Sequence, residues 1–317
     1  MLKNRNLQIE GLRGIAILMV VIYHVFCRYR QIYINENIEW MQNFGAYAVN
    51  LFFLMSGYFF NKDTTILKKI FRLWPSYVVA VFFSVVLLEF FPLPNKNLSC
   101  IQIVTNIFFL NVFFKIPYVD GAHWFIHTLI ILFLVASVLK SQKIYFFFIW
   151  LSLIATFSFL FDNKISHILF HLMGGQYACC FICGIAIKRI KEKNWIYIII
   201  LGVAEIFILQ GVLFGSVFII TVFLFFQCIK GNVRLLEAKI LTSLGLISFP
   251  LYVIHQNLAY VIEFYFFPSN MFFFGGVVSC LVCVFFACVI QKFVEQKRTW
   301  FYDVIADFAV RFYFHPR

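Results

Sequence analysis

Eleven apolar runs separated by short polar loops dominate this chain. They cover residues 9–28, 43–60, 73–91, 101–114, 122–139, 144–161, 167–187, 194–210, 212–229, 240–266 and 271–291. A bilayer core is about 30 Å thick and is crossed by about 20 helical residues, and a chain inside it must satisfy its backbone polar groups internally. Most of the runs are about that long, so the sequence predicts an all-α polytopic membrane protein. The composition agrees, because only 13% of the residues are charged, against about 25% in soluble domains.

The fourth run, 101–114, is shorter than the others and contains several polar side chains. These are Gln102, Thr105, Asn106 and Asn111. A run of this length favours a short re-entrant or interfacial helix over a spanning one. Ten transmembrane helices then remain, and both termini lie on the same side of the membrane.

The loop charges give the orientation of this topology. Of the 26 Lys and Arg residues, all but five lie on the side of the two termini. The five exceptions are Arg28, Arg30, Lys96, Lys115 and Lys164. Because Lys and Arg accumulate in cytoplasmic loops, we expect cytoplasmic N and C termini. The same bias accounts for the net charge of +12, and we expect no nucleic-acid partner.

One membrane domain, residues 1–295, and a short tail, residues 296–317, describe the organisation of the chain. The tail alternates basic and aromatic residues, which is typical of an interfacial helix on the inner leaflet. The first apolar run is followed by Arg28 and Arg30 rather than by a small-residue cleavage site, so we expect it to be retained as a membrane helix.

The nine cysteines include one tight cluster, Cys179, Cys180 and Cys183. A second pair at the spacing of a zinc site is absent from the sequence. Cysteines inside apolar runs usually serve as small packing residues. We therefore expect no metal site.

Two ionisable residues on the first apolar run, Arg13 and His24, are the strongest functional signal. Ten uncharged residues separate them. An ionisable group inside a membrane span is costly and marks a functional site by default. Eleven residues at about 1.5 Å each place the two side chains about 16 Å apart along a helix. In the expected topology Arg13 lies near the inner face and His24 in the outer half.

Other histidines lie in the outer half of the expected topology, as His24 does. His123, His127, His167 and His171 open helices at the outer face, and His255 lies deep in a later helix. A histidine of this kind is either a packing group, a base or a ligand. Because His24 and His255 lie deep within apolar helices, a functional role is favoured over packing for these two.

Cations gather at the inner end. Lys69 and Arg72 open the third run near Arg13, where they either anchor the helix or bind a phosphorylated ligand. Glu10 precedes Arg13 by one helical turn, which predicts an i,i+3 ion pair. Ser56 and Gly57 lie among aromatic residues, where they either allow close helix packing or line a pore.

These motifs, taken in order, resemble the acyltransferase 3 family of integral membrane acyltransferases. The resemblance rests on Glu10, Leu12-Arg13-Gly14 and His24; on Phe52, Phe53, Ser56, Gly57 and Tyr58; on Lys69-Ile70-Phe71-Arg72-Leu73-Trp74-Pro75; on Trp124; on Ser248 to His255; and on Glu295. Two positions depart from the family pattern. Lys69 stands where the family has an arginine, and Asn50 stands where many members have an acid.

The resemblance implies a bacterial plasma-membrane enzyme that transfers an acyl group, usually acetyl, from acetyl-CoA or another acyl-CoA. The acceptor is a hydroxyl of a surface polysaccharide or a lipid-linked glycan. Arg13, Lys69 and Arg72 would hold the donor phosphates. With Arg13, His24 would form the catalytic pair, acting as general base or as covalent carrier of the acyl group. The supporting residues would be Glu10, Ser56, Gly57, His123, Trp124 and His255.

No bound cofactor is expected beyond the acyl-CoA substrate, and the membrane lipid is the remaining partner. The alternative is a transporter or flippase for lipid-linked glycans. Transporters carry polar residues near the midplane and often show internal repeats. No convincing repeat relates the two halves of the chain, but Glu89, Glu205 and Glu263 lie in apolar runs and would then be coupling sites.

Overall fold

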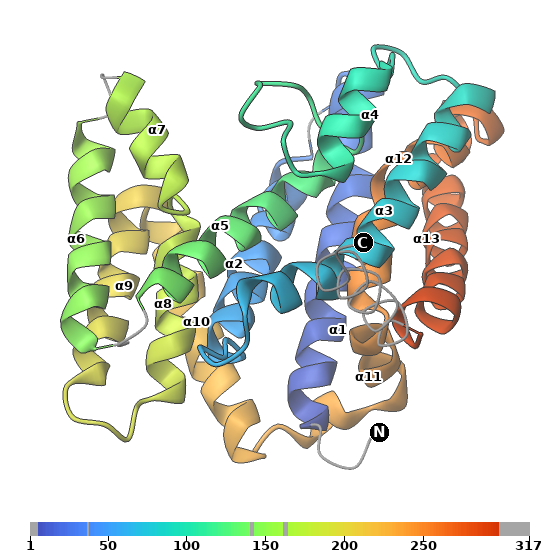
Figure 1. Cartoon of the computed structure of the whole chain (residues 1–317). Coiled ribbons are helices and arrows are strands. Elements are labelled where there is room, and N and C mark those ends of the chain that lie inside the picture. Colours follow the sequence, from blue (N-terminus) through green and yellow to red (C-terminus); the bar gives the residue numbers. More distant parts are fainter. Residues whose placement is uncertain (1–5, 37, 140–142, 161–163, 298–317) are drawn as a thin grey trace, which may run out of the picture. The chain divides into compact units, whose positions relative to one another are not determined.

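The computed structural model describes residues 6–297 except 37, 140–142 and 161–163 (Figure 1). The described residues form helices and no strand. The α-helices are α1 (Leu7–Ile22), α2 (Phe44–Tyr58), α3 (Ile66–Phe90), α4 (Cys100–Ile107), α5 (Trp124–Val138), α6 (Ile144–Phe159), α7 (Lys164–Leu172), α8 (Tyr177–Lys188), α9 (Trp195–Gln210), α10 (Val212–Lys230), α11 (Lys239–Leu246), α12 (Ser248–Phe266) and α13 (Phe272–Ile290). This confirms the all-α class. Most of the predicted tail lies outside the described residues.

Six helical stretches in the described part of the chain are long and apolar enough to cross a membrane. They are Leu7–Ile34, Ile66–Phe90, Gly121–Val138, Lys164–Lys188, Val212–Lys230 and Phe272–Glu295. A seventh is obtained if α11 and α12, bent by 75°, count as one span. The chain is thus a multi-pass membrane protein by length and composition. The predicted count of ten is not confirmed, because α2, α6 and α9 have only 15 or 16 residues.

Helix α4 occupies the short polar run of the sequence and has eight residues. At about 1.5 Å per residue it is about 12 Å long, less than half a bilayer core. Its length agrees with the expectation that this run does not cross. The other predicted runs each contain a described helix.

The described chain divides into two compact units, each built from separate stretches of sequence. Within the described residues, unit 1 comprises 6–23, 36–66 and 124–246, and unit 2 comprises 24–35, 67–123 and 247–297. Unit 1 contains α1, α2 and α5 to α11. Unit 2 contains α3, α4, α12 and α13. Each unit is described below by itself.

Unit 1 owes its close helix packing to glycines. A Cβ on Gly57 of α2 would lie 1.8 Å from the carbonyl oxygen of Phe181 in α8, and one on Gly184 of α8 would lie 2.0 Å from that of Leu54. Only glycine lets the two backbones approach this closely. α1 and α11 meet in the same way, because a Cβ on Gly14 would lie 2.1 Å from the Leu241 carbonyl oxygen.

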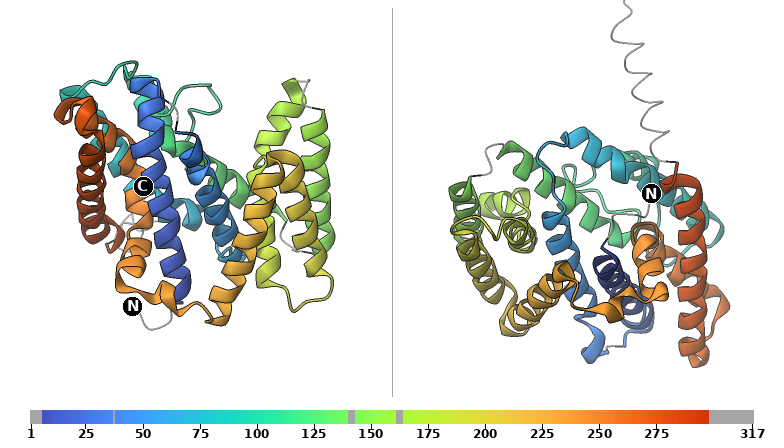
Figure 2. Two further views of the ribbon diagram at one scale, coloured as in Figure 1. Left: turned by 180° about the vertical axis from the view of Figure 1, so that it is seen from behind. Right: turned by 90° about the horizontal axis from the view of Figure 1, so that it is seen from below.

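Unit 2 is centred on α12. Every residue from Pro250 to Val261 is buried, so the helix has no solvent- or lipid-facing side over these three turns. α13 runs beside α12 (Figures 1 and 2) and has one buried face that includes Gly276, Ser279 and Cys283. Its other face exposes large apolar side chains such as Leu281 and Phe285, as expected for contact with lipid.

Candidate active site

A short segment that precedes α5 docks onto the middle of α12 within unit 2. Asp120 is fully buried, and its two carboxylate oxygens accept the backbone N–H groups of Ala122 at 2.9 Å and Asn257 at 3.0 Å. The Asn257 side chain donates from Nδ2 to the Val119 carbonyl at 3.0 Å. The Tyr252 hydroxyl donates to the Ala122 carbonyl. The segment is therefore bonded to α12 on both sides of Asp120.

His123 completes this docking. Its Nε2 lies 2.9 Å from the carbonyl oxygen of Val253. Because a carbonyl only accepts hydrogen bonds, Nε2 carries the proton. A Cβ on Gly121 would lie 2.8 Å from Nε2 of Gln256, so a larger residue at this position would displace the end of that side chain.

His255 and His24 form an edge-to-face pair at this place. Their ring centroids are 4.8 Å apart and the rings are inclined at 76°. His255 is fully buried, and its Nδ1 lies 2.7 Å from the Tyr252 carbonyl. Nδ1 thus donates to this carbonyl, and Nε2 has no hydrogen-bond partner among the described residues. The His255 ring is therefore held in one orientation beside His24.

His24 is on a short π-helix, Tyr23–Arg28, that continues α1. π-Helical turns are rare and frequently occur at functional sites, because the extra residue per turn changes which side chains face a given direction. The His24 side chain is partly exposed. It is therefore more accessible to a substrate than the buried ring of His255.

Tyr77 of α3 holds His123 from the other side. The two rings are 4.9 Å apart in an edge-to-face arrangement, and the Tyr77 hydroxyl donates to the Asn106 carbonyl at 3.1 Å. Asn106 at the end of α4 is fully buried and donates from Nδ2 to the Pro117 carbonyl at 3.1 Å, while its Oδ1 accepts the N–H of Val119 at 3.2 Å. The polar residues of this short run thus order the loop that leads to Asp120.

The charge on Asp120 is stabilised by its neighbours. Burial alone opposes ionisation of this carboxyl, but His123, Lys96, His255 and the N–H of Ala122 together hold its pKa below the usual range. Asp120 is therefore an anion at neutral pH. It can orient His123 and α12 without taking up a proton.

The predicted cations of α3 lie one and two turns before Ser76. Lys69 is buried with 8% of its surface exposed, whereas Arg72 is exposed. The hydroxyl of Ser76 donates to a carboxylate oxygen of Glu295 at 2.6 Å. Glu295, which belongs to the resemblance, therefore contacts α3 at Ser76, one helical turn beyond Arg72.

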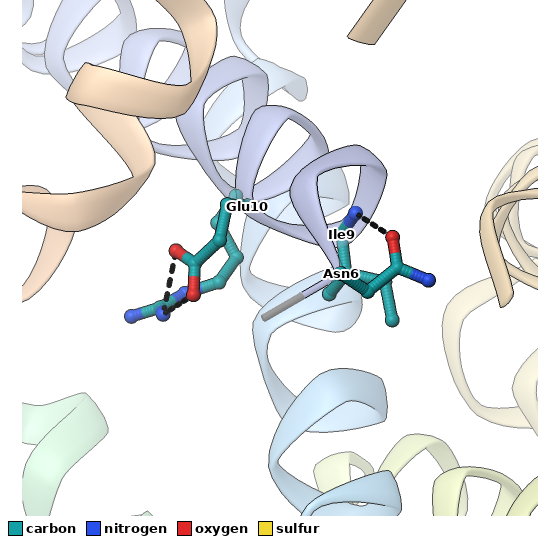
Figure 3. Close-up of polar contacts among 4 residues, drawn as sticks. Asn6, Ile9 and Glu10 are labelled. Atoms are coloured by element: carbon teal, nitrogen blue, oxygen red, sulfur yellow. Dashed lines mark hydrogen bonds and ion pairs between the residues drawn. The ribbon is translucent and has the colours of Figure 1, made fainter. Parts of the chain in front are cut away.

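Arg13 and Glu10 form the ion pair expected from their spacing. The guanidinium Nη1 lies 3.2 Å from a Glu10 carboxylate oxygen (Figure 3). Asn6 caps α1, since its side-chain oxygen accepts the N–H groups of Gln8 at 3.0 Å and Ile9 at 3.2 Å. Arg13 belongs to unit 1, whereas His24, Lys69 and Arg72 belong to unit 2. The grouping of Arg13 with these residues stays a prediction.

Ser56 and Gly57 have packing roles. The Ser56 hydroxyl donates to the Phe52 carbonyl of its own helix at 2.8 Å, and Gly57 provides the close contact with α8 described above. Of the two alternatives, these contacts favour helix packing over a pore wall. Asn50, which departs from the family pattern, donates to Gln210 Oε1 at 2.9 Å.

Trp124 and the cysteine cluster also belong to unit 1. The Trp124 ring lies 5.1 Å from that of Tyr177, so it faces the start of α8. Cys179 donates from its thiol to Glu205 at 3.1 Å. Within the described ranges, no three His, Cys, Asp or Glu side chains are placed to hold a metal ion.

Asp120 and Asn257 are site residues that the sequence analysis missed. Asp120 lies three residues before His123 and Asn257 two residues after His255. An acid just before a helix that opens with histidine is a usable signal, but its partner is 137 residues away. Their connection becomes evident only when α12 and the segment are placed together.

Comparison with known proteins decides the family. The sequence matches the acyltransferase 3 family, described as an acyltransferase domain, over residues 6–291. The chain belongs to the acyltransferase 3 family. Neither the comparison with curated proteins nor that with solved structures gave a match.

Membership of this family indicates the general function of the chain. With its apolar helices, it is a membrane acyltransferase. The family match spans both units and includes His24, His255 and the segment from Val119 to His123. The histidine pair thus lies inside the acyltransferase domain.

Proposed function

We propose that this protein is a membrane-embedded O-acyltransferase that transfers an acetyl group from acetyl-CoA to a carbohydrate hydroxyl, with His24 as general base. The acceptor is a surface polysaccharide or a lipid-linked glycan. The observation that carries the proposal is the contact between His24 and the buried His255 within an acyltransferase domain. Placing two imidazoles inside an apolar membrane protein costs free energy, and such groups usually mark a functional site.

In the proposed reaction His24 accepts the proton of the acceptor hydroxyl. The hydroxyl oxygen attacks the thioester carbonyl, the C–S bond breaks, and CoA leaves with the proton as a thiol. Proton transfer of this kind typically contributes about 10²–10⁴ in rate. The lone pair on Nε2 of His255 is suited to accept an N–H of protonated His24, which would stabilise the imidazolium. His255 is thus a positioning residue.

His123 and Asp120 support this geometry indirectly. They fix Val253 and Asn257 on α12, one helical turn or less from His255. Because α12 is buried on all sides there, a shift of this turn would move the His255 ring. We propose that the Asp120–His123 segment fixes the position of the His255 ring relative to His24.

The donor phosphates are proposed to bind Arg13, Lys69 and Arg72. Lys69 and Arg72 project from one end of α3, and an exposed guanidinium such as that of Arg72 binds phosphate by paired hydrogen bonds. Glu10 and Glu295 then orient these cations. Lys69 offers a point charge instead of a planar fork, so it contributes charge more than geometry.

The topology that suits this reaction has ten spans, cytoplasmic termini and the phosphate cations at the cytoplasmic face of a bacterial plasma membrane. Acetyl-CoA then enters from the cytoplasm. His24 lies in the outer half of the first span, which favours acceptors presented outside the cytoplasm. The charge distribution of the loops supports this orientation.

The test is a reconstituted reaction. Purified protein is incubated in proteoliposomes with acetyl-CoA labelled in the acetyl group and with glycan-bearing lipid from the producing cells. The proposal predicts CoA release together with label in the glycan. Glycan movement across the bilayer without consumption of acetyl-CoA would instead identify a transporter or flippase.

A further inference from the structure

A pocket of about 360 Å³ lies within unit 1. It is bounded by the start of α5, the end of α7 and the start of α8. Its lining includes Trp124, Thr128, His171, Gly175, Gln176 and Tyr177. The volume is near the lower end of the range for small-molecule sites, about 300–1,000 Å³. It suits one sugar ring and is too small for a whole CoA.

The pocket lies at a break in a candidate membrane span. α7 and α8 together form the stretch Lys164–Lys188, but residues 173–176 between them are not helical. Gly174 and Gly175 have φ angles of +93° and +56°, and a Cβ on Gly174 would lie 2.3 Å from a methyl group of Leu132. Glycine is therefore required for both conformation and space.

A broken helix at membrane depth has a physical consequence. Non-helical backbone is tolerated there only where it is buried in protein or lines a polar cavity. Discontinuous helices in membrane proteins commonly carry binding sites at the break. The coincidence of the break with the pocket points to a polar ligand.

The aromatic lining defines the kind of ligand. The Trp124 and Tyr177 rings are 5.1 Å apart and inclined at 35°, and both side chains are partly exposed. At this separation the two rings partly overlap, so the pair presents an outer ring face that is apolar, with polar N–H and O–H groups at its edge. A pyranose has the matching surface, since its axial C–H groups form an apolar face and its hydroxyls project from the rim.

The polar lining completes the match. His171 and Gln176 supply donors and acceptors for sugar hydroxyls. The Thr128 hydroxyl donates to the Trp124 carbonyl at 3.2 Å, which leaves its oxygen able to accept. No Asp, Glu, Lys or Arg is among the described lining residues. The pocket thus suits a neutral ligand better than a phosphate.

The chain itself links this pocket to the segment that fixes the histidine pair. Trp124 follows His123 directly, so their Cα atoms are about 3.8 Å apart. We propose that the pocket binds one pyranose ring of the acceptor glycan, stacked on the outer face of the Trp124–Tyr177 pair and hydrogen-bonded by His171 and Gln176. This inference rests on the proposed function, because it assigns the acceptor.

The test measures sugar binding separately from catalysis. Saturation-transfer NMR on the purified full chain is run with methyl glycosides of glucose, galactose, mannose and rhamnose. At least one is expected to bind, with saturation concentrated on the C–H groups of one ring face. Trp124→Ala and Tyr177→Ala should each weaken it at least tenfold, and Gln176→Ala several-fold. Trp124→Phe should retain binding within about threefold.

Matched variants keep the result interpretable. His24→Ala should leave pyranoside binding intact while abolishing transfer. If Trp124→Ala does not fold, as judged by thermal unfolding, Tyr177→Ala and Gln176→Ala decide. Sugar binding that depends on these residues, without acyl transfer by the unmodified protein, would retain the pocket assignment and refute the proposed function. Acyl transfer with no pyranoside binding, or with binding insensitive to all three substitutions, would overturn the pocket assignment.

Discussion

In the proposed site, single residues hold the histidine pair in place, and Asp120 is the most constrained of them. It is a buried anion whose two oxygens accept two backbone N–H groups. Hydrogen bonds to a charged group contribute about 1.5–3 kcal/mol each. Backbone hydrogen bonds also orient the two buried histidines. The Val253 carbonyl accepts from Nε2 of His123, and the Tyr252 carbonyl accepts from Nδ1 of His255.

Asp120→Asn tests this residue. An amide has the same shape but brings an N–H group against either Ala122 or Asn257, so we expect a loss of about 2–4 kcal/mol in the free energy of unfolding. The measurement is thermal unfolding in detergent at pH 7. An unchanged unfolding temperature would refute the role assigned to the carboxylate.

The pH dependence of this difference follows from the lowered pKa of Asp120. A carboxyl whose folded pKa is below its unfolded value of about 3.9 contributes stability that is fully present above that value. The contribution is lost as pH falls through the folded pKa. The stability gap between the unmodified protein and Asp120→Asn should thus be constant from pH 5 to 8 and shrink below about pH 4.

At the scale of elements, close helix approaches shape unit 1. Gly57 and Gly184 bring α2 against α8, and Gly14 brings α1 against α11. The Leu-Arg-Gly motif therefore has two separable functions: its glycine packs the helix, while its arginine pairs with Glu10.

Gly57→Ala should be severely destabilising, because its Cβ would lie 1.8 Å from a backbone carbonyl oxygen. Overpacking typically costs about 1–3 kcal/mol and more when backbone must move. The measure is the unfolding temperature and the fraction of monodisperse protein in size-exclusion chromatography. Gly231→Asn is the control, since Gly231 has no neighbour within 4 Å and asparagine tolerates positive φ. Equal effects at both sites would contradict the packing account.

The limits of sequence reasoning are also clearest for elements. Period and length predicted the positions of the helices, and the three-residue spacing predicted the Glu10–Arg13 pair. The apolar run 167–187 predicts one helix, but Gly174 and Gly175 divide it into α7 and α8. The run 240–266 likewise divides, with a bend of 75° before Ser248. Hydropathy does not register such breaks, because the backbone changes direction while the run as a whole stays apolar.

The candidate site was predicted only in part for a related reason. His24 and His255 stand out because they are ionisable groups in apolar helices, and the structure brings them together. Asp120 and Asn257 do not stand out, because each is an ordinary loop or helix residue until the other is beside it. Their importance comes from tertiary hydrogen bonds that no local pattern encodes.

For the whole molecule, the side from which the acyl donor enters depends on the orientation of the protein in the membrane. Cytoplasmic termini place the loop with Lys96 outside and the loop with Lys191 inside. Lys96→Cys should therefore react with a membrane-impermeant maleimide in intact cells, and Lys191→Cys only after permeabilisation. The unsubstituted protein serves as background, since it contains the exposed cysteines Cys100 and Cys288. The reverse labelling pattern would contradict the proposed entry of acetyl-CoA from the cytoplasm.

The central claim is that His24 removes the proton from the acceptor hydroxyl. The most direct measurement is the rate of transfer of labelled acetyl from acetyl-CoA to the glycan by His24→Ala in proteoliposomes. Lys164→Ala, which removes an exposed ionisable side chain at the start of α7, is the control. We predict a loss of at least about 10² in rate for His24→Ala, as for removal of a general base, and a rate near that of the unmodified protein for the control. Full transfer by a folded His24→Ala protein would contradict the account.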